Sequence, residues 1–226
     1  MRVHAGLVDC RLCPRLVEWR ERKATTERRV AFADQPYWGR PVPSFGPIDA
    51  PILIVGLAPA AHGANRTGRM FTGDRSGEWL YRALHRVGLA TSPDHEDPDL
   101  ELIGCRITAV CHCAPPDNRP TPEEVTTCVD TWLVPEMAAV ASRVVVALGG
   151  LAWNRVLRAG PGWGWEVPRP RPRFGHGAEI SIPGGPVLLG TYHPSQQNTF
   201  TGKLTRAMFD DIWQRAVLIQ GGTTPL

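Results

Sequence analysis

The sequence predicts an α/β protein, a three-layer α/β/α domain with a central, largely parallel sheet of four strands. Apolar runs that are too short for surface helices predict the strands, at residues 51–55, 107–111, 144–148 and 187–192. Segments with helical character separate these runs, and strands that alternate with helices form parallel sheets covered on both faces. The 226 residues suit one domain. We expect it to span 1–226, with residues 1–50 packed on it as an N-terminal arm.

Helix-start signals place the helices between the strands. Pro14 begins a basic helical stretch, Ser76 can cap the next helix, and Thr121 with Glu124 predicts a capping box. The predicted helices cover 15–29, 76–87, 121–133, 151–157 and 203–219. Residues 160–177 are dense in Pro, Gly, Trp and Arg and predict a long exposed loop, either a contact for an anionic partner or a plain insertion.

Composition limits the classes of protein to consider. Hydrophobic residues make up 42% and charged residues 21%, as in soluble globular proteins. No stretch approaches the ~20 apolar residues that cross a membrane, and the first ten residues lack a signal-peptide core. We therefore expect a cytoplasmic protein with reduced thiols and no membrane partner. The net charge of +3 is weak evidence for nucleic acid. Nearly all cations are arginines, which suits phosphate binding but equally accompanies a GC-rich genome.

Polar loops follow three of the predicted strands, at 56–74, 112–119 and 193–198. The carboxyl ends of parallel strands lie at one edge of a sheet, where open α/β sheets bind ligands, so these loops should converge. The first loop is rich in glycine, which lets a backbone approach a ligand closely. Phe71 could stack on a flat ring there, and Asp74 could do acid–base or electrostatic work. The alternative is an ordinary surface loop.

The cysteines predict a metal centre. Cys10 and Cys13 form a CxxC motif, and Cys113 and Cys128 lie on either side of a proline-rich loop and a helix start. Four thiolates suit either tetrahedral zinc or a [4Fe–4S] cluster, and the spacing does not choose between them. A thioredoxin-like redox pair is disfavoured because the CxxC does not follow a strand. The remaining two cysteines are expected to be core residues.

Two enzyme classes are excluded by missing motifs. No GxSxG elbow is present for a serine hydrolase, and GLAPAA falls short of the GxGxxG dinucleotide fingerprint. His193, on the turn after the last strand, is either catalytic or structural.

Three segments together resemble the uracil-DNA glycosylase superfamily, and within it family 5, the type B iron–sulfur enzymes of bacteria and archaea. They are GLAPAAHGANRTGRMFTGD from Gly56, CHCAPPDNRPTPEE from Cys111 and HPSQQNTFTGKLT from His193. The resemblance implies a parallel four-stranded sheet, a [4Fe–4S] cluster and a monofunctional enzyme that leaves an abasic site. Its substrate would be double- or single-stranded DNA that contains uracil or other deaminated bases, and a monomer would suffice. The implied cluster ligands are Cys10, Cys13, Cys113 and Cys128.

The resemblance also implies roles for the loop residues. The expected catalytic residues are Asp74, His193 and Asn118. Those expected to bind the flipped base are Gly56, Leu57, Ala58 and Phe71. Contacts to the rest of the DNA are expected as well. Gln196, Gln197 and Asn198 would enter the base stack and fill the vacated space, and Arg66, Arg69 and Arg75 either contact phosphates or are solvated surface charges.

Two departures from related families predict broad specificity. Other families place a carboxylate or asparagine in the first motif, whereas residues 56–59 carry no ionisable group, and Ala109 stands where family 4 has an asparagine. Without these groups a pocket loses the paired readout that rejects wrong bases, so hypoxanthine should be accepted with uracil. A lesion-binding module without catalysis and an iron–sulfur redox protein are the competing interpretations.

Overall fold

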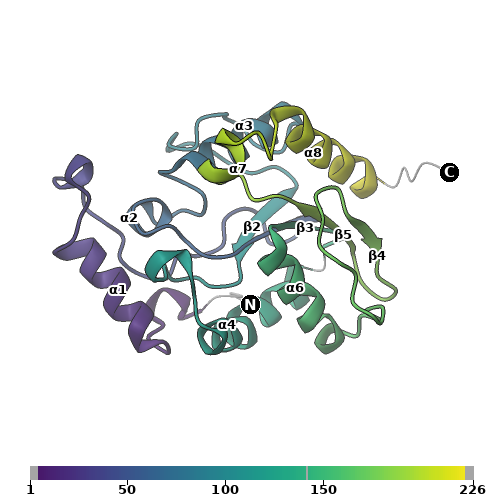
Figure 1. The fold of residues 1–226 in the computed structure, drawn as a ribbon, viewed down its shortest axis with the longest axis horizontal. Coiled ribbons are helices and arrows are strands. Elements are labelled where there is room, and N and C mark those ends of the chain that lie inside the picture. The colour runs from purple at the N-terminus through teal and green to yellow at the C-terminus, as the bar shows by residue number, and fades with distance from the viewer. Residues whose placement is uncertain (1–4, 141, 222–226) are drawn as a thin grey trace.

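The protein is built on a five-stranded sheet with the strand order β2-β1-β3-β5-β4 (Figure 1). A computed structural model describes residues 5–140 and 142–221; the predicted domain and arm also include 1–4, 141 and 222–226, which lie outside the described residues. The strands are β1 (Ile52–Gly56), β2 (Cys105–Ala109), β3 (Val144–Leu148), β4 (Glu179–Ser181) and β5 (Val187–Thr191).

The predicted three-layer α/β/α class is confirmed, but the number of strands was wrong. β1, β2, β3 and β5 pair in parallel, as expected, whereas β4 pairs antiparallel with β5. β4 has only three residues and no fully buried position, so it leaves no apolar run to detect. β2 begins two residues earlier than predicted, because Cys105 pairs with Ile52 at the start of β1. The apolar run extends past the strand because the following loop is also buried.

Helices cover both faces of the sheet. The α-helices are α1 (Pro14–Thr25), α2 (Ala64–Thr67), α3 (Arg75–Arg86), α4 (Pro122–Cys128), α5 (Val134–Val140), α6 (Gly150–Ala159), α7 (Gln196–Phe200) and α8 (Arg206–Gln220). A π-helical turn, η4 (Val129–Leu133), joins α4 to α5. The 3-10 turns are η1 (Leu7–Asp9), η2 (Val30–Phe32), η3 (Pro116–Asn118) and η5 (Gly160–Trp163).

Several helix boundaries differ from the prediction. α8 begins at Arg206 instead of residue 203, α6 ends at Ala159 instead of residue 157, and the helix predicted at 121–133 is divided after Cys128. Thr121 forms the predicted capping box with Glu124. The cap of α3, however, is Asp74 rather than Ser76: Asp74 has extended backbone angles, and its side chain accepts a hydrogen bond from the Gly77 N–H. α1 ends at Thr25 instead of residue 29. A short helix, α7, was not predicted and lies in the loop after β5.

Alternate residues of each strand point into two hydrophobic cores. Ile52 and Ile54 pack in the core under α3 and α8, which lie together on one side of the sheet in Figure 1. Leu53 and Val55 pack in the second core, with α4, α5 and α6 on the opposite side. A strand that is buried on both faces has a continuous apolar sequence, which is why short apolar runs identified these strands.

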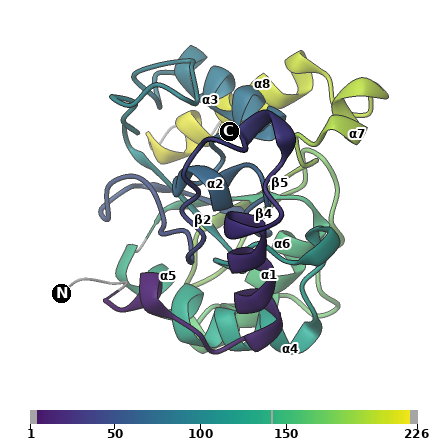
Figure 2. The ribbon, with the colours of Figure 1, turned by 90° about the vertical axis from the view of Figure 1, so that its left-hand side faces the viewer.

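The N-terminal segment contacts the rest of the domain through α1 and through an extended crossing segment that contains Ser44 and Phe45. α1 lies in front of α2 in Figure 2, and Arg15 forms an ion pair of 2.7 Å with Glu124 at the start of α4. The crossing segment then runs beside β2, where Phe45 and Ile107 form an antiparallel bridge. Ser44 donates a hydrogen bond of 2.9 Å to the buried carboxylate of Glu136. Side-chain and backbone contacts thus join the segment to α4, α5 and β2.

The predicted loop at 160–177 is only partly exposed. Trp163 and Trp165 pack against each other with ring centroids 4.7 Å apart, and the Trp153 indole donates a hydrogen bond to the Pro172 carbonyl. The arginines of the loop, Arg169 among them, are exposed. Within the described residues, no helix is both long enough and apolar enough to span a bilayer.

Candidate active site

The three predicted loops meet around one pocket of about 460 Å³ at the carboxyl edge of the sheet. It is lined by Leu57, Ala58, Pro59, Ala60, Ala64, Met70, Phe71, Asp74, Ser76, Ala109, Asn118, His193, Ser195 and Gln197. The structure therefore brings together all three residues predicted to be catalytic and most of those predicted to bind the base. The pocket wall is mainly apolar, with a few polar groups, as in small-molecule binding sites.

Asp74 lies at the junction of the glycine-rich loop and α3. Its Oδ1 accepts the Gly77 N–H at 2.9 Å, which fixes the orientation of the carboxylate at the positive end of the helix dipole. Its Oδ2 lies against Gly63, where a Cβ atom would come within 2.6 Å of it. The glycine thus leaves space beside this second oxygen.

Phe71 is held flat against the end of β1 by two glycines. Its backbone adopts φ 55°, which is uncommon for an aromatic residue. A Cβ on Gly56 would lie 3.0 Å from the Phe71 ring, and one on Gly77 would lie 1.7 Å from the Phe71 carbonyl oxygen. Gly56, which was predicted to bind the base, therefore lies against the Phe71 ring and does not line the pocket. Any side chain at Gly77 would displace the loop.

His193 lies across the pocket from Phe71, with ring centroids 6.0 Å apart. Burial lowers its pKa, and the nearby Asp74 carboxylate opposes that shift only in part. The imidazole is therefore favoured in its neutral form, which has one N–H donor. The backbone carbonyl of His193 accepts a hydrogen bond of 2.8 Å from the Asn198 amide. Asn198 thus orients the histidine turn, whereas it was predicted to contact DNA.

Asn118 ends the loop after β2 in a left-handed conformation. It and Asp117 have φ values of 55° and 53°, which asparagine and aspartate tolerate better than most residues. The Asn118 side chain is exposed at the pocket rim. Its amide makes no hydrogen bond to another side chain or backbone group that the structure describes, so it remains available to a ligand.

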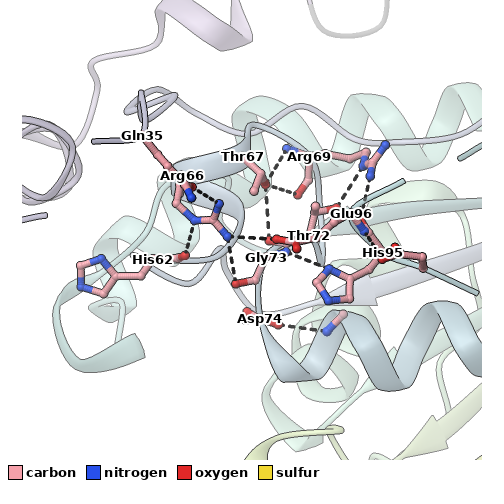
Figure 3. Close-up of polar contacts among 12 residues, drawn as sticks. Gln35, His62, Arg66, Thr67, Arg69, Thr72, Gly73, Asp74, His95 and Glu96 are labelled. Atoms are coloured by element: carbon pink, nitrogen blue, oxygen red, sulfur yellow. Dashed lines mark hydrogen bonds and ion pairs between the residues drawn. The ribbon is translucent and has the colours of Figure 1, made fainter. Parts of the chain in front are cut away.

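The arginines predicted to bind phosphate differ in their surroundings, and Figure 3 shows two of them, Arg66 and Arg69. Arg69 donates hydrogen bonds to the carbonyls of His95 (2.7 Å) and Asp97 (2.9 Å), and Arg66 pairs with Glu96 at 3.2 Å. These contacts make both guanidinium groups part of the scaffold behind the glycine loop. Arg75 instead lies over the ring of Phe200 at 4.4 Å, beside the pocket.

The four cysteines predicted as ligands surround a second cavity, between α1 and α4. Cys10, Cys13, Cys113 and Cys128 all line it, with mainly apolar neighbours. Burial, and to a lesser degree the nearby Cys128, raises the pKa of the Cys13 thiol to about 11. The buried Arg20 donates to the Cys113 sulfur at 2.9 Å. A buried cation beside several thiols compensates the negative charge of thiolate ligands.

This donor set fits a cluster better than a single ion. No three His, Cys, Asp or Glu side chains in the described ranges are close enough together to hold one metal ion. A tetrahedral zinc would draw four sulfurs to about 3.8 Å from one another, given a Zn–S bond of about 2.3 Å. In a [4Fe–4S] cluster each sulfur binds a different iron, which spreads the ligands over a wider cavity.

Several residues at these sites were missed by the sequence analysis. Arg20 falls on the apolar stripe of α1 with Leu16 and Ala24, and a charge on such a stripe is a signal that could have been used. Ser195 lines the pocket and caps α7. Phe200, with 68% of its surface exposed, lies at the end of α7, where no pattern in the sequence distinguishes it from a core residue.

Comparison with known proteins agrees with this geometry. Residues 43–217 match the model of the Uracil DNA glycosylase superfamily. A Type-5 uracil-DNA glycosylase of Mycobacterium bovis is 56% identical over 97% of this chain and 81% of the relative. The Type-5 enzyme of Thermus thermophilus is 48% identical over 95% of both chains. A Type-4 uracil-DNA glycosylase of Thermotoga maritima is 30% identical over 74% of this chain and 77% of the relative. The chain belongs to the uracil DNA glycosylase superfamily.

Proposed function

We propose that the protein is a DNA-repair glycosylase that hydrolyses the bond between uracil and deoxyribose and leaves an abasic site. The observation that carries this proposal is the convergence of Asp74, Asn118 and His193 on one pocket whose wall includes an aromatic ring. Family membership and the Type-5 names of the relatives support the same activity.

The substrate base must leave the helix to reach the pocket. Flipping a nucleotide out of a duplex costs a few kcal/mol, and less at a mismatch. Phe71 would stack on the flipped base, and the backbone amides of Leu57 and Ala58 would donate hydrogen bonds to its carbonyl oxygens. The pocket is large enough for one base, at about 460 Å³.

Cleavage separates two opposite charges. When the C1′–N bond breaks, its electron pair leaves with the base, and positive charge develops on the sugar. The Asp74 Oδ2 would stabilise that charge and accept a proton from the water that adds to C1′. Neutral His193 and the Asn118 amide would donate hydrogen bonds to the departing base, and these bonds strengthen as its negative charge grows.

We also propose that the pocket accepts hypoxanthine. Ala109 contributes only a methyl group to the lining, and residues 57–60 contribute no side-chain donor or acceptor. A pocket without paired side-chain donors and acceptors rejects a second deaminated base poorly.

The four clustered cysteines would hold a [4Fe–4S] cluster. Its role would be structural, because it would cross-link the N-terminal segment to α4. Iron and acid-labile sulfide should each be found at four atoms per chain. Cys113→Ala should lose both, whereas Cys105→Ala should keep them, because Cys105 is a core residue of β2. One zinc per chain and no sulfide would show that the cluster assignment is wrong.

The activity is tested with end-labelled duplexes that carry one U·G or one hypoxanthine·T pair, followed by alkaline cleavage. Cleavage of both substrates, the U·G duplex and the hypoxanthine·T duplex, supports a broad-range glycosylase. Cleavage of U·G alone would disprove the hypoxanthine proposal and leave the uracil activity standing. If neither were cleaved by protein that holds its metal, the protein would be a lesion-binding module instead.

A further inference from the structure

A groove of about 720 Å³ extends from the active-site pocket to α1. The pocket and the groove share part of their walls, namely Ala60, Asp74, Ser76, Asn118, Ser195 and Gln197. Its far wall is formed by Trp19 and Lys23 of α1 and by Arg29 and Phe32 next to it. α1 and α2 lie next to each other in Figure 2, so the wall of α1 faces the glycine-rich loop.

Cations outnumber anions along this groove. Lys23, Arg29 and Arg75 line it, against the carboxylates of Asp74 and Asp117. Lys23 is paired with Glu27 at 2.6 Å. The exposed Arg29 guanidinium forms no ion pair or hydrogen bond within the described parts of the chain. Asp74 belongs to the catalytic pocket, so the wall on the α1 side is cationic.

His62 also lines the groove and is affected by this charge. Burial lowers its pKa, and so do the positive charges of Lys23, Arg29 and Arg66. Its Nδ1 lies 3.0 Å from the hydroxyl of Tyr37. The imidazole therefore lies in a positive potential, of the kind that attracts phosphate.

The position of the groove favours an extended strand over a compact ligand. It leads directly out of the pocket that would hold the flipped base, and the backbone of that nucleotide has to continue on both sides of it. Grooves that combine cations with aromatic side chains bind nucleic-acid strands, and Trp19 and Phe32 supply the aromatic groups here.

We infer that this groove binds the DNA strand that flanks the flipped nucleotide, with Lys23 and Arg29 contacting its phosphates. The inference rests on the proposed glycosylase function and extends it to α1, which would carry both a DNA-binding surface and, just before it, two cysteine ligands. It also replaces the predicted contacts from Arg66 and Arg69, whose guanidinium groups are held inside the protein.

The test compares the K23A/R29A double variant with wild-type protein. Binding is measured to a duplex with a single tetrahydrofuran abasic-site analogue, which cannot be cleaved, over a range of salt concentrations. Two lost phosphate contacts should reduce the slope of log K against log [salt] by about 1.8. If the two phosphate contacts contribute nothing to affinity near 1 M salt, K23A/R29A should bind the duplex about 30-fold more weakly than wild type at about 0.15 M salt. The R155A/R158A variant of α6 removes the same charge outside both cavities and should bind like wild type.

The titration of His62 provides a second readout that does not depend on activity. Duplex binding should raise the His62 pKa, followed by NMR, because phosphates would offset the nearby cations. In K23A/R29A the pKa should already be higher in the free protein. The inference would be overturned if duplex binding left the His62 pKa unchanged, or if K23A/R29A had the same salt slope as wild type.

The two proposals can fail separately. Single-turnover excision of uracil by wild-type protein tests the glycosylase proposal, whereas the salt slope of DNA binding by K23A/R29A tests the groove. If wild-type protein showed the salt-dependent binding but no excision, the glycosylase proposal would fail and the groove would stand. If it excised uracil with an unchanged salt slope in K23A/R29A, only the groove assignment would fail.

Discussion

The two carboxylate oxygens of Asp74 have different surroundings, so substitutions can separate their effects. Oδ1 caps α3 through the Gly77 N–H at 2.9 Å, and Oδ2 is the oxygen assigned to the sugar and the water. Asp74→Asn keeps an oxygen for the cap but removes the charge. Asp74→Ala removes both.

The expected stability changes follow from these contacts. Loss of the charge at the helix N-terminus costs about 0.5 kcal/mol, and loss of the cap costs about 1 kcal/mol. Each kcal/mol shifts Tm by about 2–4 °C in a protein of this size. Asp74→Asn should therefore lower Tm by about 1–2 °C and Asp74→Ala by about 3–6 °C. The rate of uracil excision should fall about 10²–10³-fold in both variants.

Thermal unfolding by circular dichroism and single-turnover excision on a U·G duplex measure the two effects. Thr205→Ala is the matched control, since Thr205 caps α8 by accepting the Met208 N–H and lies outside the pocket. It should lose about 1 kcal/mol and keep the full excision rate. The reasoning is refuted if Asp74→Asn excises uracil within threefold of the wild-type rate.

Further predictions concern the surroundings of the same pocket. Gly56→Ala places a methyl group 3.0 Å from the Phe71 ring and should slow excision with little loss of DNA affinity, measured by single-turnover kinetics and anisotropy. Because the pKa of His193 is lowered in the folded protein, its contribution to stability is present above about pH 6.5 and is lost as pH falls through the folded-state pKa. Denaturant unfolding from pH 7.5 to 5 should therefore show a smaller decline in the free energy of unfolding for His193→Gln than for wild type. Asn198→Ala should lower the excision rate at saturating enzyme more than the affinity for the abasic-site duplex, because Asn198 holds the His193 carbonyl. Arg69→Ala should cost about 2–4 kcal/mol of stability through lost charged hydrogen bonds and leave the salt slope of DNA binding unchanged, since its guanidinium binds backbone carbonyls.

The layered fold and the position of the pocket could be predicted because they depend on local signals. A parallel strand buried on both faces must be continuously apolar, and the loops at its carboxyl end must meet their neighbours. The loops that carry Asp74, Asn118 and His193 were identified in this way. The antiparallel β4 could not be found, because a three-residue strand with exposed ends is determined by its partner β5 rather than by its own residues.

The contacts of individual polar side chains were harder to predict, because they depend on how each loop folds and on neighbours that can lie far away in the sequence. Arg69 resembles any loop arginine until His95 and Asp97 are placed beside it. Asn198 was expected at the DNA surface, and only the fold brings its amide to the carbonyl of His193. Short polar residues in loops have several possible partners, and tertiary contacts decide among them.

The bridge between Phe45 and Ile107 bears on how the protein behaves when concentrated. β2 is the outermost strand on its side of the sheet, and Phe45 exchanges both backbone hydrogen bonds with Ile107, at 2.9 and 2.8 Å. At the opposite margin, β4 is only three residues long, and its Glu179 forms an ion pair with Arg215. Exposed strand margins recruit other chains into aggregates, and a covering segment, short length and charge all prevent such pairing. The protein should therefore resist strand-mediated aggregation, although β1, β3 and β5 are almost wholly apolar.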